Sequence, residues 1–167
     1  MHKERAYIGL GSNMGEAGKH IESAFLAIAE LEHTRLLRTA SLYQSAPMGP
    51  QNQPDFINSV CLVETGLEPE VLLKQLQQIE NDHGRERKGE RWGPRTLDLD
   101  ILLYGNYEID TDILTIPHSG IADREFVLVP LFEIAPNMVM PDGKPISQWV
   151  ASCSLDGLKR LRPSNEL

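Results

Sequence analysis

Two kinds of hydrophobic pattern alternate along the chain and predict its strands and helices. Short apolar runs bounded by glycine or proline predict strands, and the run at 56–65 is apolar on both faces, as in a strand at the centre of a sheet. Apolar residues spaced three and four positions apart predict amphipathic helices. The predicted strands cover 5–11, 34–45, 56–65 and 97–104, and the predicted helices cover 15–31 and 69–83.

The predicted elements follow the order β-α-β-β-α-β, which is the split βαβ arrangement of ferredoxin-like folds. We therefore expect the α+β class, with an antiparallel sheet that carries its helices on one face. The segment 46–54 contains three prolines and one glycine, so it is expected to be a loop.

Beyond residue 106 the hydrophobic pattern weakens. It predicts only a short strand at 107–109, a short helix at 124–131 and a turn at 141–144. The sequence shows no internal repeat and no linker, so we expect residues 1–167 to form a single domain with a C-terminal extension.

Length and composition are those of an ordinary globular protein. Of the 167 residues, 41% are hydrophobic and 24% charged, and the longest apolar run, 126–132, is too short to cross a membrane. We expect a cytoplasmic protein, because the first residues lack the apolar segment of a secretory signal. Cys61 and Cys153 lie far apart without Cys-x-x-Cys spacing, which favours two reduced thiols over a disulfide or a zinc site.

The charge of the chain is negative overall but positive in one segment. A net charge of −8 and a pI near 5.1 argue against general binding to nucleic acid or anionic membranes. The eleven residues 85–95, however, hold five basic and two acidic side chains. Arginine guanidinium groups match phosphate oxygens in geometry, and Trp92 is a costly residue in a polar loop unless it packs on a partner. We therefore favour a glycine-rich lid that binds phosphate over a solvated charged loop.

Asp98 and Asp100 lie two positions apart in a predicted strand, so both side chains share one face. Carboxylates about 6–7 Å apart repel each other by about 2–3 kcal/mol at an effective dielectric constant near 20. A solvated strand face tolerates this repulsion, and so does a site for Mg²⁺, which prefers one or two carboxylates with phosphate oxygens and water. Because the pair follows the basic segment directly, we favour the chemistry of phosphoryl transfer.

Phe56 and Asn58 also share one face of a predicted strand. An aromatic ring beside an amide is suited to holding a heteroaromatic ring, although a single Phe is more often part of a core. His118, in a predicted loop, is interpreted either as a phosphate donor or as an exposed side chain. The sequence contains no P-loop, no dinucleotide-binding glycine motif and no Gly-x-Ser-x-Gly, which argues against those nucleotide sites and against a catalytic triad.

Several of these motifs together resemble a known family. The twelve residues 91–102, RWGPRTLDLDIL, resemble the signature of the 6-hydroxymethyl-7,8-dihydropterin pyrophosphokinases of folate biosynthesis, and 47–58 resembles their pterin-side loop. Gly11-Ser12-Asn13, Pro117-His118 and 130–136 match in order and spacing, so the resemblance covers about 6–149. It implies a ferredoxin-like fold, and transfer of a pyrophosphoryl group from ATP to the pterin hydroxymethyl oxygen with AMP as the other product.

The resemblance also implies roles for individual residues. Asp98 and Asp100 would bind two Mg²⁺ ions that bridge the triphosphate, and Arg85 and Arg95 would stabilise the transferring group. The residues implied to contact or frame ATP are Gln77, Glu80, Arg87, Arg91, Trp92, Ile101, Thr115, His118 and Arg124. Those implied to bind the pterin, with the two Phe rings stacked on it, are Asn13, Ser45, Pro47, Met48, Phe56, Asn58 and Phe126. ATP and hydroxymethyl dihydropterin are the expected partners, with no nucleic acid, no membrane and no obligate protein partner.

The chain departs from the family pattern at three positions. Phe56 stands where Tyr is common, which keeps the stacking face and loses a hydroxyl group. Ser119 stands where an aromatic hydroxyl is common, so a nucleotide contact is in question there, and Asn52 replaces a frequent Asp. The sequence shows no dihydropteroate synthase or aldolase segment, so we expect the monofunctional form.

Two other functions are compatible with parts of this pattern. A different two-metal enzyme, a nucleotidyltransferase or cyclase, also uses Asp-x-Asp on a ferredoxin-like fold, and it would release pyrophosphate rather than transfer it. A non-catalytic βαββαβ binding module is the second alternative. The acidic pI and the lack of an aromatic RNA-binding strand motif argue against the RNA-binding version of that module.

Overall fold

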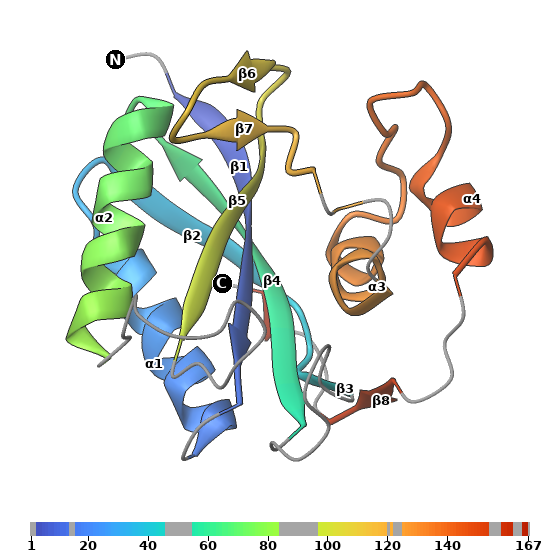
Figure 1. Ribbon diagram of the computed structural model, residues 1–167, viewed down its shortest axis with the longest axis horizontal. Coiled ribbons are helices and arrows are strands. Elements are labelled where there is room, and N and C mark those ends of the chain that lie inside the picture. The colour runs from blue at the N-terminus through green and yellow to red at the C-terminus, as the bar shows by residue number, and fades with distance from the viewer. Residues whose placement is uncertain are drawn as a thin grey trace.

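The helices and strands of the chain pack as three layers, with a β-sheet between two pairs of helices (Figure 1). The computed structural model describes residues 3–13, 16–45, 55–83, 97–119, 121, 125–153, 158–161 and 165–166. The helices are α1 (Ala17–Ala29), α2 (Pro69–Asp82), α3 (Glu125–Ile134) and α4 (Ile146–Ala151). The strands are β1 (Glu4–Ser12), β2 (Thr34–Thr39), β3 (Tyr43–Ser45), β4 (Phe56–Thr65), β5 (Asp98–Tyr104), β6 (Ile109–Asp110), β7 (Thr115–Ile116), β8 (Lys159–Arg160) and β9 (Asn165–Glu166).

The main sheet has the strand order β5-β1-β4-β2-β9, and its neighbours pair antiparallel. The four predicted strands supply β1, β2, β4 and β5, and the two predicted helices supply α1 and α2. This arrangement confirms the predicted α+β, ferredoxin-like class. It also confirms that the run at 56–65 is central, because β4 pairs with β1 on one side and with β2 and β3 on the other.

Alternation along the strands divides the core in two. On β4, Cys61 and Val63 point toward α1 and α2, while Val60 and Leu62 point toward α3. The prediction of helices on one face therefore holds for α1 and α2. The C-terminal extension supplies α3 and α4, which cover part of the opposite face (Figure 1).

The structure corrects the predicted strand at 34–45, which is two strands. Residues 40–42 leave the regular ladder because their backbone groups have other partners: the Ser59 hydroxyl donates to the carbonyls of Ala40 and Ser41, and the Ser41 N–H donates to the carboxylate of Glu133. The strand β3 that follows pairs with β4 and with β8.

The C-terminal third holds more regular structure than its pattern predicts. The predicted strand at 107–109 overlaps β6 only at Ile109, and β6 forms a hairpin with β7, while the predicted helix at 124–131 corresponds to most of α3. The sequence analysis missed β7, α4, β8 and β9. Both terminal strands are two residues long and pair with β3 and β2, and such short strands leave no periodic signal.

Two further features concern the helices and the cysteines. Within the described ranges, no helix is long and apolar enough to cross a membrane. Neither Cys61 nor Cys153 is in a disulfide, and burial raises the pKa of the Cys61 thiol far above its usual value.

Candidate functional site

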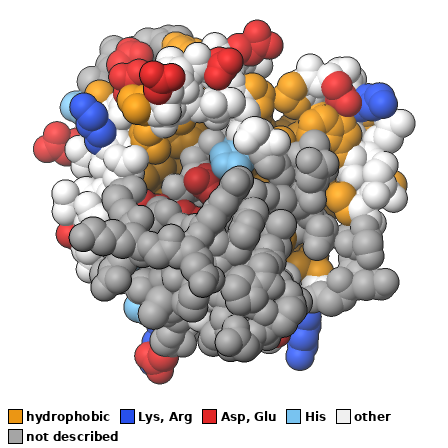
Figure 2. All heavy atoms as spheres, in the orientation of Figure 1, with side chains coloured by type: hydrophobic (Ala, Val, Ile, Leu, Met, Phe, Trp, Pro, Cys, Tyr) orange, Lys and Arg blue, Asp and Glu red, His pale blue; other side chains and the backbone are white. Residues whose placement is uncertain are grey.

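Asp98 and Asp100 lie on the face of β5 that α1 and α2 do not cover. Leu99, between the two aspartates, and Ile101, after Asp100, point into the core on the other face, as the alternation of side chains along a strand requires. Both aspartates are half-buried, and the Asp100 side chain keeps 43% of its exposure. Figure 2, which looks onto the β5 edge of the sheet, shows acidic side chains near the middle of the view. The two carboxylates therefore share one accessible surface.

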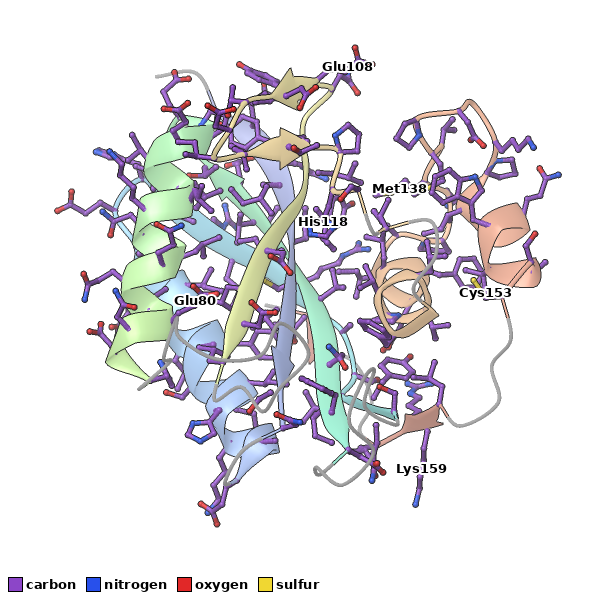
Figure 3. The ribbon with its side chains drawn as sticks, in the orientation of Figure 1. Glu80, Glu108, His118, Met138, Cys153 and Lys159 are labelled. Atoms are coloured by element: carbon purple, nitrogen blue, oxygen red, sulfur yellow. The ribbon has the colours of Figure 1, made fainter. Side chains whose placement is uncertain are left out.

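Glu80 holds the strand segment that carries the two aspartates. It projects from α2 toward β5 and is only 2% exposed (Figure 3). Its carboxylate accepts the backbone N–H of Leu99, between the two aspartates, at 2.8 Å. Among the described strands β5 pairs only with β1, and at the free edge of β5 the carboxylate of Glu80 takes the place of a neighbouring strand's carbonyl. A hydrogen bond to a carboxylate is stronger than one to a carbonyl. Glu80 thus fixes the edge at the position of the carboxylates.

His118 lies beside the same edge. Its backbone N–H donates to the Leu102 carbonyl at 2.9 Å, and this bond holds the chain after β7 against β5. Its ring Nε2 is 3.9 Å from Asp100 Oδ2, within the range of an ion pair when the imidazole is protonated. Thr115 is exposed two residues before Pro117, on β7. Of the two predicted nucleotide residues, His118 is therefore beside Asp100, while Thr115 lies three residues earlier, on the β6–β7 hairpin.

Asn58 lies in one row with Asp98 across three strands. In the register of the sheet, Gly11 on β1 pairs with Asn58 on one side and with Asp98 on the other. Directly opposed residues of antiparallel strands point to the same face, so the amide and the carboxylate flank a position without a side chain. A Cβ at Gly11 would lie 2.7 Å from Asn58 Nδ2, so only glycine leaves room for this amide.

The amide of Asn58 is incompletely satisfied. Its Nδ2 donates to the Leu10 carbonyl at 3.4 Å, while Oδ1 is buried and finds no hydrogen-bond partner within the described part of the chain. A buried acceptor without a donor costs about 1–3 kcal/mol. The amide oxygen is therefore suited to receive a donor from a ligand.

Aromatic and small polar residues lie on the strands next to Asn58 and on the helix that covers the same face. Phe56 lies on the same face of β4, opposite Ser45 of β3, and Phe126 is at the start of α3, which covers this face. Both Phe side chains are half-buried, and Ser45 is buried. Asn13, also buried, follows the end of β1.

Two predicted residues occupy other positions in the site. Ile101 is 2% exposed within the core against α1 and α2, so its side chain cannot reach the face of the aspartates. Any contact that it makes with a nucleotide comes from its backbone. Gln77, half-buried on α2, lies one turn before Glu80.

The remaining predicted site residues lie outside the described residues: Pro47, Met48, Arg85, Arg87, Arg91, Trp92, Arg95 and Arg124. The basic segment is therefore not part of the geometry above. In the part of the chain that the structure describes, no three His, Cys, Asp or Glu side chains form a metal cluster. A cation bound by the two carboxylates of Asp98 and Asp100 would leave most of its coordination positions to other molecules.

Three residues that the sequence analysis did not select contribute to this site. Gly11 clears the space beside Asn58, and Tyr43, opposite Asn58 on β3, donates its hydroxyl group to Glu133 of α3. Gly11 and Glu133 are within segments that resemble the family, Gly11-Ser12-Asn13 and 130–136. The resemblance therefore included both residues but did not indicate what they contact.

Comparison with known proteins gives consistent results. Residues 7–136 match the family described as 7,8-dihydro-6-hydroxymethylpterin-pyrophosphokinase. The chain is 49% identical over 158 residues to the 2-amino-4-hydroxy-6-hydroxymethyldihydropteridine pyrophosphokinase of Haemophilus influenzae, covering 95% of this chain and 98% of that protein. It is 45% identical to the Pseudomonas aeruginosa protein of the same name, covering 95% and 97%.

Longer proteins contain a similar segment. The folic acid synthesis protein fol1 of Schizosaccharomyces pombe is 41% identical over 136 residues, which are 81% of this chain and 18% of that protein. A crystal structure of an HPPK-DHPS in complex with substrates superposes with a TM-score of 0.73 at 14% identity, over 96% of this chain. This chain spans about half of that longer one, 47%, and at such identity the likeness shows the fold alone.

Proposed function

The chain belongs to the 7,8-dihydro-6-hydroxymethylpterin-pyrophosphokinase family, and we propose that the row from Asn58 to Asp98 joins the two halves of its active site. The enzyme transfers a pyrophosphoryl group from ATP to the hydroxymethyl group of 6-hydroxymethyl-7,8-dihydropterin, in folate biosynthesis. The pterin oxygen forms a bond to the β-phosphorus, and the bond from that phosphorus to the α-phosphate oxygen breaks. AMP leaves with this oxygen, and the hydroxyl proton is released.

The nucleotide half centres on Asp98 and Asp100, which we assign as ligands of Mg²⁺. The residues fit this ion: both carboxylates are on one face, both are accessible, and no third protein ligand is present in the described ranges. Mg²⁺ keeps several waters and is held by one or two carboxylates plus substrate phosphates, so a pair suffices. Bound there, two ions would neutralise charge on the β- and γ-phosphates and polarise the transferred group.

The chain's own residues keep this half in place. Glu80 fixes the edge strand through Leu99, so the two carboxylates keep their separation when the triphosphate binds. We assign His118 and Thr115 as nucleotide contacts beyond the edge of β5, and the position of the His118 ring 3.9 Å from Asp100 supports the assignment of His118. Gln77, on α2, borders the proposed nucleotide site. Arg85 and Arg95 would stabilise the transferring group, with Arg87, Arg91, Trp92 and Arg124 around the phosphates and base.

The pterin half centres on Asn58. Its buried Oδ1 accepts a donor from the edge of the ring, while Phe56 and Phe126 pack on the two ring faces and Ser45 and Asn13 border it. The distance across the sheet from Asn58 to Asp98 is two strand spacings, about 10 Å. This distance is similar to the length of a bicyclic ring with its hydroxymethyl arm. The row of Asn58, Gly11 and Asp98 is the observation that carries this proposal.

The products of the reaction test the function directly. With ATP, Mg²⁺ and hydroxymethyl dihydropterin, the purified protein is expected to form AMP and pterin diphosphate one to one, and label from β-³²P-ATP should appear in the pterin. Chromatography of the labelled nucleotides and pterins measures both. Formation of ADP would rule out pyrophosphoryl transfer. Release of free pyrophosphate with no formation of pterin diphosphate would indicate a cyclase or nucleotidyltransferase instead.

A further inference from the structure

The carboxylate of Glu133, on α3, is the centre of a hydrogen-bond cluster beside the pterin half. Oε1 accepts the Tyr43 hydroxyl at 2.6 Å, and Oε2 accepts the Ser41 hydroxyl at 2.7 Å. The Ser41 backbone N–H lies 3.1 Å from Oε1 and 3.3 Å from Oε2. The Glu133 side chain is only 12% exposed. One carboxylate thus joins α3 to β3 and to the residues just before it.

The C-terminal segment reinforces this cluster. Arg160, on β8, donates from Nε to the Ser41 hydroxyl oxygen at 3.0 Å, and its Nη2 lies 3.7 Å from Glu133 Oε2. In the register of the sheet Arg160 pairs with Tyr43, and the Leu161 N–H donates to the Leu42 carbonyl at 2.7 Å. The start of β3 is therefore held both by α3 and by the last part of the chain.

The residues that Glu133 holds are neighbours of the proposed pterin ligands. Tyr43 is directly opposite Asn58, and two residues later Ser45 is opposite Phe56. On α3, Phe126 precedes Glu133 by seven residues, which is two helical turns and about 10 Å along the same helix face. The cluster therefore sets the distance between Phe126 on the helix and the Phe56–Asn58 pair on the sheet.

Packing alone would not set that distance. The layer between α3 and the sheet is mostly apolar, with residues such as Val60, Leu62, Leu128 and Leu131, and apolar contacts have little directionality. A carboxylate in this layer pays a desolvation cost that a leucine would avoid. Short hydrogen bonds to a charged group, in contrast, fix both position and rotation. Burial and the contact with Glu133 raise the pKa of Tyr43, so its hydroxyl remains a donor.

We propose that Glu133 is a positioning residue for the pterin pocket, which acts through Ser41 and Tyr43 to hold Phe126 at stacking distance from Phe56 and Asn58. The proposal rests on the pterin site proposed above. It assigns Glu133 no contact with substrate. Its loss should therefore weaken pterin binding selectively, because the nucleotide half lies on β5, at the other end of the row.

The test is calorimetric binding of hydroxymethyl dihydropterin, with a non-hydrolysable ATP analogue and Mg²⁺ present, to Glu133→Leu and Glu133→Gln variants of the full chain. The pterin Kd should rise about 10-fold or more for Leu and less for Gln, which keeps one acceptor oxygen, while the Kd of the ATP analogue stays within about 2-fold. Tyr43→Phe, which removes one hydroxyl group, should raise the pterin Kd by a smaller factor than Glu133→Leu. It replaces Glu133→Leu as the test variant if that protein fails to fold.

Arg38→Met is the matched control. Arg38 donates to the Ile134 carbonyl at 2.9 Å, so it also ties α3 to the sheet, but from β2 rather than β3. This variant should lower Tm without raising the pterin Kd. If the Glu133 and Arg38 variants lower Tm equally and leave pterin binding equally unchanged, Glu133 is only a stabilising residue and the proposal is wrong. Asn58→Leu distinguishes failure of the positioning role of Glu133 from failure of the pterin site on which it rests. If this variant keeps full pterin affinity, the proposed pterin site itself is wrong.

Discussion

Replacement of Asp98 or Asp100 by Asn is expected to lower kcat by more than about 100-fold. Substitution of residues that only support a metal ligand costs about 10- to 100-fold, so loss of a ligand's charge should exceed that range. The fold should survive, because Asn has the same shape and its neutral amide removes the repulsion between the two carboxylates. Steady-state kinetics at saturating ATP and pterin, over a range of Mg²⁺ concentrations, measure the loss.

The control for this prediction is Asp110→Asn. Asp110 is an exposed aspartate on β6, outside the proposed site, and its replacement should leave kcat within about 2-fold. Thermal unfolding without metal should give the Asp98 and Asp100 variants a Tm equal to or above that of the wild type. If either variant turns over near the wild-type rate, the assignment of that carboxylate to the metal is wrong.

Replacement of Gly11 by Ala is expected to weaken pterin binding by about 10- to 100-fold, because small misplacements of a ligand-orienting group have effects of this size. The new Cβ would lie 2.7 Å from Asn58 Nδ2, so the amide must move. The pterin KM should rise much more than the ATP KM, and initial rates with each substrate varied in turn measure both.

Gly9→Ala is the comparison for this change, because it adds the same methyl group two residues earlier on the same strand face. Its Cβ would lie 3.3 Å from Leu102 Cδ2, the end of a flexible side chain that can shift by a few tenths of an ångström. The rise in pterin KM should therefore be clearly smaller than for Gly11→Ala. Equal rises in the two variants would contradict the role of Gly11 in making room for Asn58.

The local pattern of the sequence was sufficient for the fold class, for the order of the main elements up to β5 and for the faces of its strands. Alternation placed Asp98 and Asp100 together on β5, and Phe56 and Asn58 together on β4. The register that aligns Asn58 with Asp98 through Gly11 is a property of the assembled sheet, so strand periodicity alone could not predict it.

Contacts between distant segments could not be predicted for the same reason. Glu80 reaches Leu99 from a helix 19 residues earlier, and Glu133 reaches Ser41 across 92 residues. Each is an acidic residue on an otherwise apolar helix face, where the hydrophobic pattern shows only an interruption. The motif match also implied a nucleotide contact for Ile101. The alternation of β5 turns its side chain into the core, so a contact through its backbone stays a prediction.

A crystal structure with hydroxymethyl dihydropterin, a non-hydrolysable ATP analogue and Mg²⁺ tests the central claim most directly. The account predicts both substrates on the sheet face shared by Asn58 and Asp98, with Asp98 and Asp100 oxygens about 2.0–2.1 Å from Mg²⁺. The pterin ring should lie between Phe56 and Phe126, with Asn58 Oδ1 accepting a hydrogen bond from it. A pterin bound away from Asn58, or Mg²⁺ ions that contact neither aspartate, would contradict the account.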